Sequence, residues 1–190
     1  MVNRVSITAT LVMLIIALFA FLVTENNHNI FIKPNYENLT PEAQKQVQCL
    51  AKNIYFEARN EPTQGQVAVA FVTLNRVKSG EFPDTICGVV EQKTRVAAIG
   101  DRGVVCQFSW YCEKVPKYIY TKNILTNRND PLYNDIRDLA LYVYANYEKM
   151  SDPTHGSLFY HADYVRPNWK NLQKVTQIGA HIFYVKRNSI

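Results

Sequence analysis

The sequence lacks the patterns of the commonest metal and nucleic-acid sites. It has four cysteines and four histidines, but it contains no Cys-x-x-Cys pair and no helical histidine pair of the metalloprotease type, so we predict no bound metal and no cofactor. The remaining candidates for metal ligands match no zinc motif; they are His155, His161, Asp163 and His181. Zinc-finger spacing, an RNP-like aromatic motif and runs of basic residues are absent too, so no nucleic-acid partner is expected.

The first 23 residues contain almost no charge. Val5 to Val23 are apolar except for one serine and two threonines, which is close to the length of about 20 residues that a membrane-spanning helix needs. Arg4 precedes this segment, and the positive-inside bias then places the rest of the chain outside the cytoplasm. No small-x-small cleavage site follows, which favours an uncleaved signal anchor over a removed signal peptide. We therefore predict a transmembrane anchor over residues 1–23 and an exported remainder.

The exported remainder is long enough for one domain with a sizeable core. We predict a tether over residues 24–39 and a single domain over residues 40–190. The chain carries 21 basic and 16 acidic residues, a net charge of +5. A cationic exported domain is attracted to an anionic polymer or to a membrane surface.

All four cysteines lie outside the predicted anchor, at Cys49, Cys87, Cys106 and Cys112. Their number is even and the exported compartment is oxidising, which favours one or two disulfides. Cys106 and Cys112 are favoured as a pair because they are close in the sequence. Three connectivities remain open from the residues alone.

Helical patterns come first and strand patterns last. Helices are predicted from the Thr40 cap to Ala58, over residues 64–78 and from Pro131 onward, with a short helix over 85–92 capped by Asp84. Residues 93–105 read as a loop or hairpin. Three short β-branched or aromatic runs follow, over 157–161, 174–178 and 181–185. The order predicts an α+β domain with a small C-terminal antiparallel sheet.

Glu57 lies near the end of the first predicted helix. At about 100° per residue it falls roughly 80° from the middle of the apolar stripe, on the rim of the buried face. Pro62 disfavours helical dihedrals at Glu61, and Asn60 tolerates the left-handed conformation that ends many helices. A half-buried acid beside a chain reversal is positioned to hold a proton and donate it. The alternative is a surface glutamate near a helix end.

Six segments carry a family resemblance, in chain order: Leu50 to Ala70 with its Glu57-Ala-Arg motif, Leu74 to Val77, Phe82 to Val90, Cys106 to Trp110, Leu158 to Ala162 and Ile178 to Tyr184. Together they resemble the SleB/CwlJ family of cell wall hydrolases. The resemblance implies a lysozyme-like α+β fold, cleavage of peptidoglycan glycan strands between MurNAc and GlcNAc, and Glu57 as the catalytic acid. The chain departs from the family at Asn60, where glycine is usual, and in an insert over residues 95–105.

The resemblance favours a lytic transglycosylase, in which Glu57 acts first as acid and then as base and leaves a 1,6-anhydro end. Hydrolysis is the alternative, with Glu61 or Asp163 activating a water molecule, although Glu61 is better placed to brace the turn. A catalytically inactive wall-binding protein and a zinc amidase are further alternatives.

Five residues within these motifs are candidates for substrate binding. Gln107, Ser109 and Trp110 lie between two cysteines, where they could contact sugar hydroxyls and stack on a ring. Tyr160 and His161 lie on a predicted strand, and His161 precedes a loop. The alternative for all five is structural: aromatic packing, with Gln107 and His161 in structural hydrogen bonds.

Overall fold

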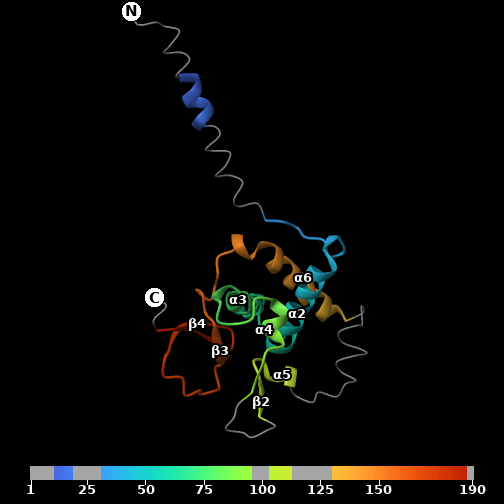
Figure 1. The fold of residues 1–190 in the computed structure, drawn as a ribbon, viewed down its shortest axis with the longest axis vertical. Helices are drawn as coiled ribbons and strands as arrows, with labels where there is room; N and C mark the ends of the chain where they lie inside the picture. The colour runs from blue at the N-terminus through green and yellow to red at the C-terminus, as the bar shows by residue number, and fades with distance from the viewer. Residues whose placement is uncertain (1–10, 19–30, 96–102, 113–129, 188–190) are drawn as a thin grey trace, which may run out of the picture. The chain divides into compact units, whose positions relative to one another are not determined.

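The computed structural model describes residues 11–18, 31–95, 103–112 and 130–187 (Figure 1). The chain divides into two units, Met1–Ile32 and Lys33–Ile190. In the first unit, residues 11–18 are helical, and the large apolar side chains there are 53% to 69% exposed. Within the described ranges no helix has the length and apolarity needed to cross a bilayer. Most of the predicted anchor and residues 24–30 of the predicted tether lie outside those ranges.

Two long helices begin the second unit, after a 3₁₀ turn at Tyr36–Asn38 (η2). Helix α2 spans Pro41–Ala58, and the Thr40 side chain accepts a hydrogen bond from the Ala43 amide, as its sequence predicts. Helix α3 spans Thr63–Ser79 and ends at Gly80, whose φ of 70° suits glycine. Both helices agree with prediction to within one residue at each end.

The core forms where α2 packs against α3, α4 (Ile86–Val90) and α6 (Pro131–Asn146). Its largest fully buried side chains come from these helices and include Leu50, Ile54 and Ile136. A short 3₁₀ turn, Tyr147–Lys149 (η5), follows α6. The predicted cap of the short helix was wrong by one residue, because Thr85 rather than Asp84 accepts the Gly88 amide hydrogen bond.

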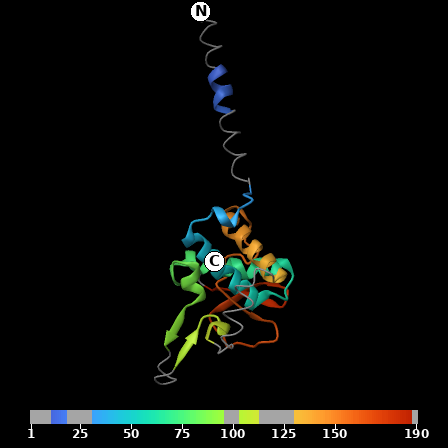
Figure 2. The same ribbon diagram turned by 90° about the vertical axis from the view of Figure 1, so that its right-hand side faces the viewer.

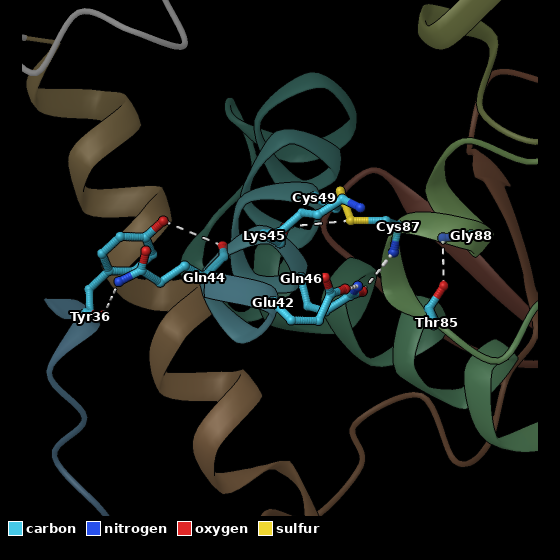
Figure 3. Close-up of a disulfide and its surroundings, with 9 residues drawn as sticks. All are labelled: Tyr36, Glu42, Gln44, Lys45, Gln46, Cys49, Thr85, Cys87 and Gly88. Carbon is cyan, nitrogen blue, oxygen red and sulfur yellow. Dashed lines mark hydrogen bonds between the residues drawn. A yellow bond between two sulfur atoms is a disulfide. The ribbon is translucent and has the colours of Figure 1, made fainter. Parts of the chain in front are cut away.

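Two disulfides join the cysteines. Cys106–Cys112 is the pair that sequence proximity favoured, and Cys49–Cys87 links α2 to α4. Figure 3 shows the Cys49–Cys87 bridge with the Gln46 side chain beside it. This side chain accepts a hydrogen bond from the Cys87 backbone amide at 3.0 Å. A covalent bond and a hydrogen bond therefore fix the short helix against α2.

The strands form two antiparallel sheets. The first is a hairpin of β1 (Lys93–Arg95) and β2 (Val104–Cys106), followed by the short helix α5 (Ser109–Cys112). Figure 2 shows this hairpin projecting away from the helices. The second sheet has the order β3-β5-β4, from Phe159–Ala162, His181–Lys186 and Leu172–Ile178. It lies beside α3 (Figure 1), with Phe183 packed against Ala68 and Val72. The predicted α+β class with a small C-terminal antiparallel sheet is confirmed.

Candidate active site

Glu57 is the penultimate residue of α2 and is half-buried, on the rim of the apolar face where its spacing predicts it. Its carboxylate oxygen Oε2 accepts a hydrogen bond from the Tyr160 hydroxyl at 3.1 Å. The two residues are 103 positions apart in the sequence. The fold therefore brings the predicted catalytic acid and one predicted substrate-binding residue into direct contact.

Tyr160 presents its hydroxyl from strand β3. Burial, the largest cause, raises its pKa well above the ordinary value of 10, and the neighbouring Glu57 charge and hydrogen bond raise it further. The positive charge of Arg76 opposes this shift. The hydroxyl therefore keeps its proton at neutral pH and donates a hydrogen bond to the Glu57 carboxylate.

Arg76, on α3, is the functional candidate that residue-by-residue reading missed. It is only 3% exposed, and its Nε donates a hydrogen bond to the Leu158 carbonyl at 2.8 Å. Its guanidinium carbon lies 5.1 Å from the ring centroids of both Phe82 and Phe108. A charged residue on a helix with few exposed positions was the signal available in the sequence, since a buried charge requires a specific partner.

The Arg76 charge acts on both members of the Tyr160–Glu57 pair. Burial lowers the pKa of Arg76, and the charges of Tyr160 and Glu57 raise it, in that order of size. Arginine remains protonated even so. Its Nη1 is buried and has no hydrogen-bond partner among the described residues. The site therefore places a fixed cation where its charge acts on the Glu57 carboxyl group.

The Tyr160 ring is held in place from several sides. His181 meets it edge-on at 5.1 Å between ring centroids, and Phe183 lies at 5.7 Å. The carbonyl of Leu158, two residues earlier, is fixed by Arg76. The hydroxyl is therefore directed at Glu57 by packing rather than by the hydrogen bond alone.

Trp110 belongs to the core, which corrects its assignment as a sugar-stacking residue. It is 6% exposed, stacks on Phe56 at 4.5 Å between centroids and donates from Nε1 to Asn53 at 3.3 Å. The backbone N–H of Gln107 donates a hydrogen bond to the backbone carbonyl of Gln92. Ser109 is exposed at the start of α5. Trp110 and the backbone of Gln107 therefore have structural roles, in core packing and in a backbone hydrogen bond.

His161 lies on the opposite face of β3 from Tyr160, because neighbouring residues of a strand point to opposite sides. Its ring nitrogens lie 2.8 Å from the Ala162 carbonyl oxygen and 2.8 Å from the Tyr184 hydroxyl. The ring also stacks on Tyr184 at 5.2 Å between centroids. The structure thus brings Tyr160 to Glu57 and directs His161 away from it.

Glu61 braces the turn between β4 and β5. Its Oε2 accepts a hydrogen bond from the Ala180 amide at 2.9 Å. Gly179, with φ of 58°, precedes Ala180, and a Cβ there would lie 1.9 Å from the same oxygen, so only glycine fits. Asp163, the other candidate second acid, is exposed, and its amide donates to the Ala180 carbonyl at 2.7 Å.

The four candidate metal ligands do not form a metal site among the described residues. His155 and Asp163 are exposed, whereas His181 is buried against Tyr160. Across residues 11–18, 31–95, 103–112 and 130–187, no three His, Cys, Asp or Glu side chains converge. Two cavities, of about 300 Å³ and 310 Å³, are lined by other residues, and Glu57 lines neither of them.

Comparison with curated proteins gives matches to spore cortex-lytic enzymes. The chain is 48% identical over 59 residues to the enzyme from Oceanobacillus iheyensis, covering 31% of this chain and 21% of the relative. It is 41% identical over 61 residues to the enzyme from Bacillus subtilis, covering 32% and 20%. The chain thus matches about a fifth of the length of these relatives.

Comparison with solved structures gives two matches that cover most of the chain. The catalytic domain of the germination-specific lytic transglycosylase SleB from Bacillus anthracis is 29% identical, with a TM-score of 0.50, over 80% of this chain and 99% of that one. The catalytic domain of the Bacillus cereus SleB protein is 28% identical, with a TM-score of 0.48, over 78% and 94%.

The cell wall hydrolase family model matches residues 60–184, about two thirds of the chain. The match begins three residues after Glu57 and includes Arg76 and Tyr160. It agrees with the six ordered motifs and confirms the resemblance that they carry. The chain therefore belongs to the family of cell wall hydrolases.

Proposed function

We propose that this domain, a lysozyme-like α+β unit, cleaves peptidoglycan glycan strands between MurNAc and GlcNAc, with Glu57 as the proton donor. The observation that carries the proposal is the hydrogen bond from Tyr160 to the half-buried Glu57 carboxylate at 3.1 Å. A carboxyl group fixed by a tyrosine hydroxyl, at a helix end beside a chain reversal, has the orientation that general acid catalysis requires.

In the proposed reaction Glu57 gives its proton to the glycosidic oxygen as the bond to the anomeric carbon breaks. The resulting carboxylate then takes the proton of the MurNAc C6 hydroxyl as that oxygen attacks the anomeric carbon. The products are a 1,6-anhydro end and a free hydroxyl on the leaving sugar, and Glu57 regains its proton. Tyr160 and the Arg76 cation stabilise the charged carboxylate between the two steps.

Two observations support transglycosylation over hydrolysis. Glu61 has its carboxylate engaged by the Ala180 amide, which leaves it poorly placed to activate water. The similar protein from Bacillus anthracis is itself described as a lytic transglycosylase. A mechanism in which one acid serves both steps needs no second carboxylate.

The test is mass spectrometry of muropeptides released from purified walls by the full chain, by Glu57→Gln and by Glu37→Gln, an exposed glutamate used as control. We expect anhydro ends from the chain and the control, and at least about a hundredfold slower release by Glu57→Gln. Reducing ends would establish hydrolysis instead. Unchanged muropeptide release by Glu57→Gln would show that Glu57 is not the catalytic acid. If the full chain bound walls without releasing muropeptides, it would be a wall-binding protein.

We also propose that the N-terminal segment anchors the domain on the exported side of a membrane. The helical residues 11–18 expose their apolar side chains, and the apolar sequence continues to Val23 after Arg4. The full chain should stay in the membrane pellet after alkaline carbonate washing, whereas a chain beginning at residue 24 should be released. Release of the full chain at its intact mass, or of a shortened product, would contradict a retained anchor.

A further inference from the structure

The three-stranded sheet has two faces of different character. Tyr160 and Phe183 face α3, and Phe183 is fully buried there. The opposite, outer face carries Phe159, Tyr184 and Lys174, which are paired across the three strands and therefore lie side by side. Figure 1 shows the sheet beside α3. The outer face is thus separate from the side that presents Tyr160 to Glu57.

Aromatic rings form a continuous cluster on this outer face. Trp169, from the loop between β3 and β4, lies 6.2 Å from Phe159, 5.4 Å from His161 and 5.6 Å from Tyr184 between ring centroids. Its contacts are edge-on, and the residue remains 41% exposed. Exposed indole and phenol rings offer flat apolar surfaces with a polar edge, which suits the C–H faces of sugar rings.

Most of the net charge of the chain lies in the segment that builds this face. Residues 163–187 hold five basic residues and one acidic residue, so they contribute +4 of the total +5. The remainder of the chain has 16 basic and 15 acidic residues. Lys186 forms an ion pair with Glu81, whereas the other basic residues of the segment are exposed; these are Arg166, Lys170, Lys174 and Arg187.

We infer that the outer face of this sheet, with the Trp169 loop, is a docking surface for the anionic glycan strands of the cell wall, distinct from the catalytic site. The inference rests on the proposed function for the identity of the polymer. Aromatic rings on a chain segment that carries four exposed cations, with Lys174 paired beside Tyr184, match a polysaccharide that carries carboxylates. Docking on this face leaves Glu57 accessible and raises the local concentration of strands around it.

The test measures co-sedimentation of the full chain, in detergent and carrying Glu57→Gln to prevent cleavage, with purified insoluble walls. Trp169→Ala and the double variant Lys170→Glu/Lys174→Glu should each weaken binding by at least about fivefold. The matched control is Lys33→Glu/Lys45→Glu, which makes the same change in net charge at two exposed lysines outside the sheet. Binding by the control should fall by less than about twofold.

A second measurement separates docking from catalysis and from misfolding. With Glu57 intact, the same variants should cleave short soluble glycan fragments at the wild-type rate, because a short fragment fills only the catalytic site. The inference is overturned if Lys170→Glu/Lys174→Glu and the control Lys33→Glu/Lys45→Glu bind walls equally. It is also overturned if these changes affect only binding to phosphatidylglycerol vesicles. A chain that binds walls through this face but releases no fragments would refute the proposed function and leave the docking surface standing.

Discussion

A buried arginine stands behind the contact that links Tyr160 to Glu57. Burying a cation is costly unless it is hydrogen-bonded and attracted to an anion. Arg76 satisfies this through the Leu158 carbonyl, two aromatic faces and the attraction of Glu57. The same charge favours the ionised form of the acid. A general acid that must next act as a base needs this kind of support.

Tyr160→Phe removes one hydrogen bond and keeps the packed ring. We expect kcat on soluble glycan fragments to fall about tenfold with KM little changed, because a hydrogen bond to a charged group contributes about 1.5–3 kcal/mol. Tyr164→Phe is the control, since this residue is 81% exposed and its hydroxyl lies in solvent. Equal kcat for the two variants would mean that the 3.1 Å contact has no catalytic role.

Arg76→Met removes the cation near Glu57. The alkaline limb of the pH–activity profile, where the proton donor Glu57 becomes ionised, should move to higher pH, because the Glu57 carboxylate loses an attractive charge. Arg76→Lys, which keeps the charge, should leave the limb closer to its wild-type position. Both variants lose the planar contacts with Phe82 and Phe108, so a loss of stability common to both reports packing. An alkaline limb at the same pH in the wild type and both variants would show that Arg76 has no role in the mechanism.

At the level of elements, helix α2 connects the covalent framework with the site. Its middle carries Cys49, bonded to Cys87 of α4, and its end carries Glu57. Figure 3 shows the bridge and the Gln46 contact on the same side of α2. Fixing α4 against α2 keeps the core around Leu50 and Ile54 closed. The bridge therefore stabilises the helix that positions the acid without touching the acid itself.

Replacing both cysteines of this bridge with alanine should lower the free energy of unfolding by about 4 kcal/mol in the chain-entropy account, because the bridge closes a separation of 38 residues. The corresponding change at Cys106 and Cys112, with a separation of 6, should cost only about 2 kcal/mol. Urea denaturation of both double variants measures the difference. A larger loss of unfolding free energy from removing the Cys106–Cys112 bridge would contradict this order.

For the whole molecule, stability depends on pH through His181. Burial lowers the pKa of His181 below its usual 6.5, helped by His161 and opposed by Glu61 and Asp163. The folded state therefore favours the neutral imidazole. As pH falls below about 6.5, the unfolded chain binds this proton first. The stabilisation is complete above that pH and is lost as pH falls through the folded-state pKa.

His181→Phe should keep the edge-on contact with Tyr160 and remove this titration. We expect the variant to lose less stability than the wild type between pH 7.5 and pH 5, approximate limits set on either side of the ordinary histidine pKa. Thermal unfolding at several pH values gives both curves, and their difference isolates His181 from the carboxylates that also titrate. Parallel curves would show that His181 does not contribute.

Local signals account for the parts of the fold that were predicted well. The Thr40–Pro41 start and the Pro62 break bound α2, and the spacing of Val47, Leu50 and Ile54 orients it, so the half-buried position of Glu57 follows from the sequence. Short β-branched and aromatic runs separated by Pro167 and Gly179 mark the three strands of the C-terminal sheet. These features depend on residues within one or two turns of one another.

The composition of the site was decided only by the tertiary structure. From the sequence, the consecutive residues Tyr160 and His161 are equally good candidates for the site. Only the packing of one face of β3 against α3 directs the Tyr160 hydroxyl to Glu57 and the His161 ring to the outer face. Similarly, only packing shows that Trp110 fills the core and that Arg76 lies near the acid. Helix caps and strand runs are local and can be read along the chain, whereas the facing of elements some 20 to 100 residues apart is set by the burial of all of them together.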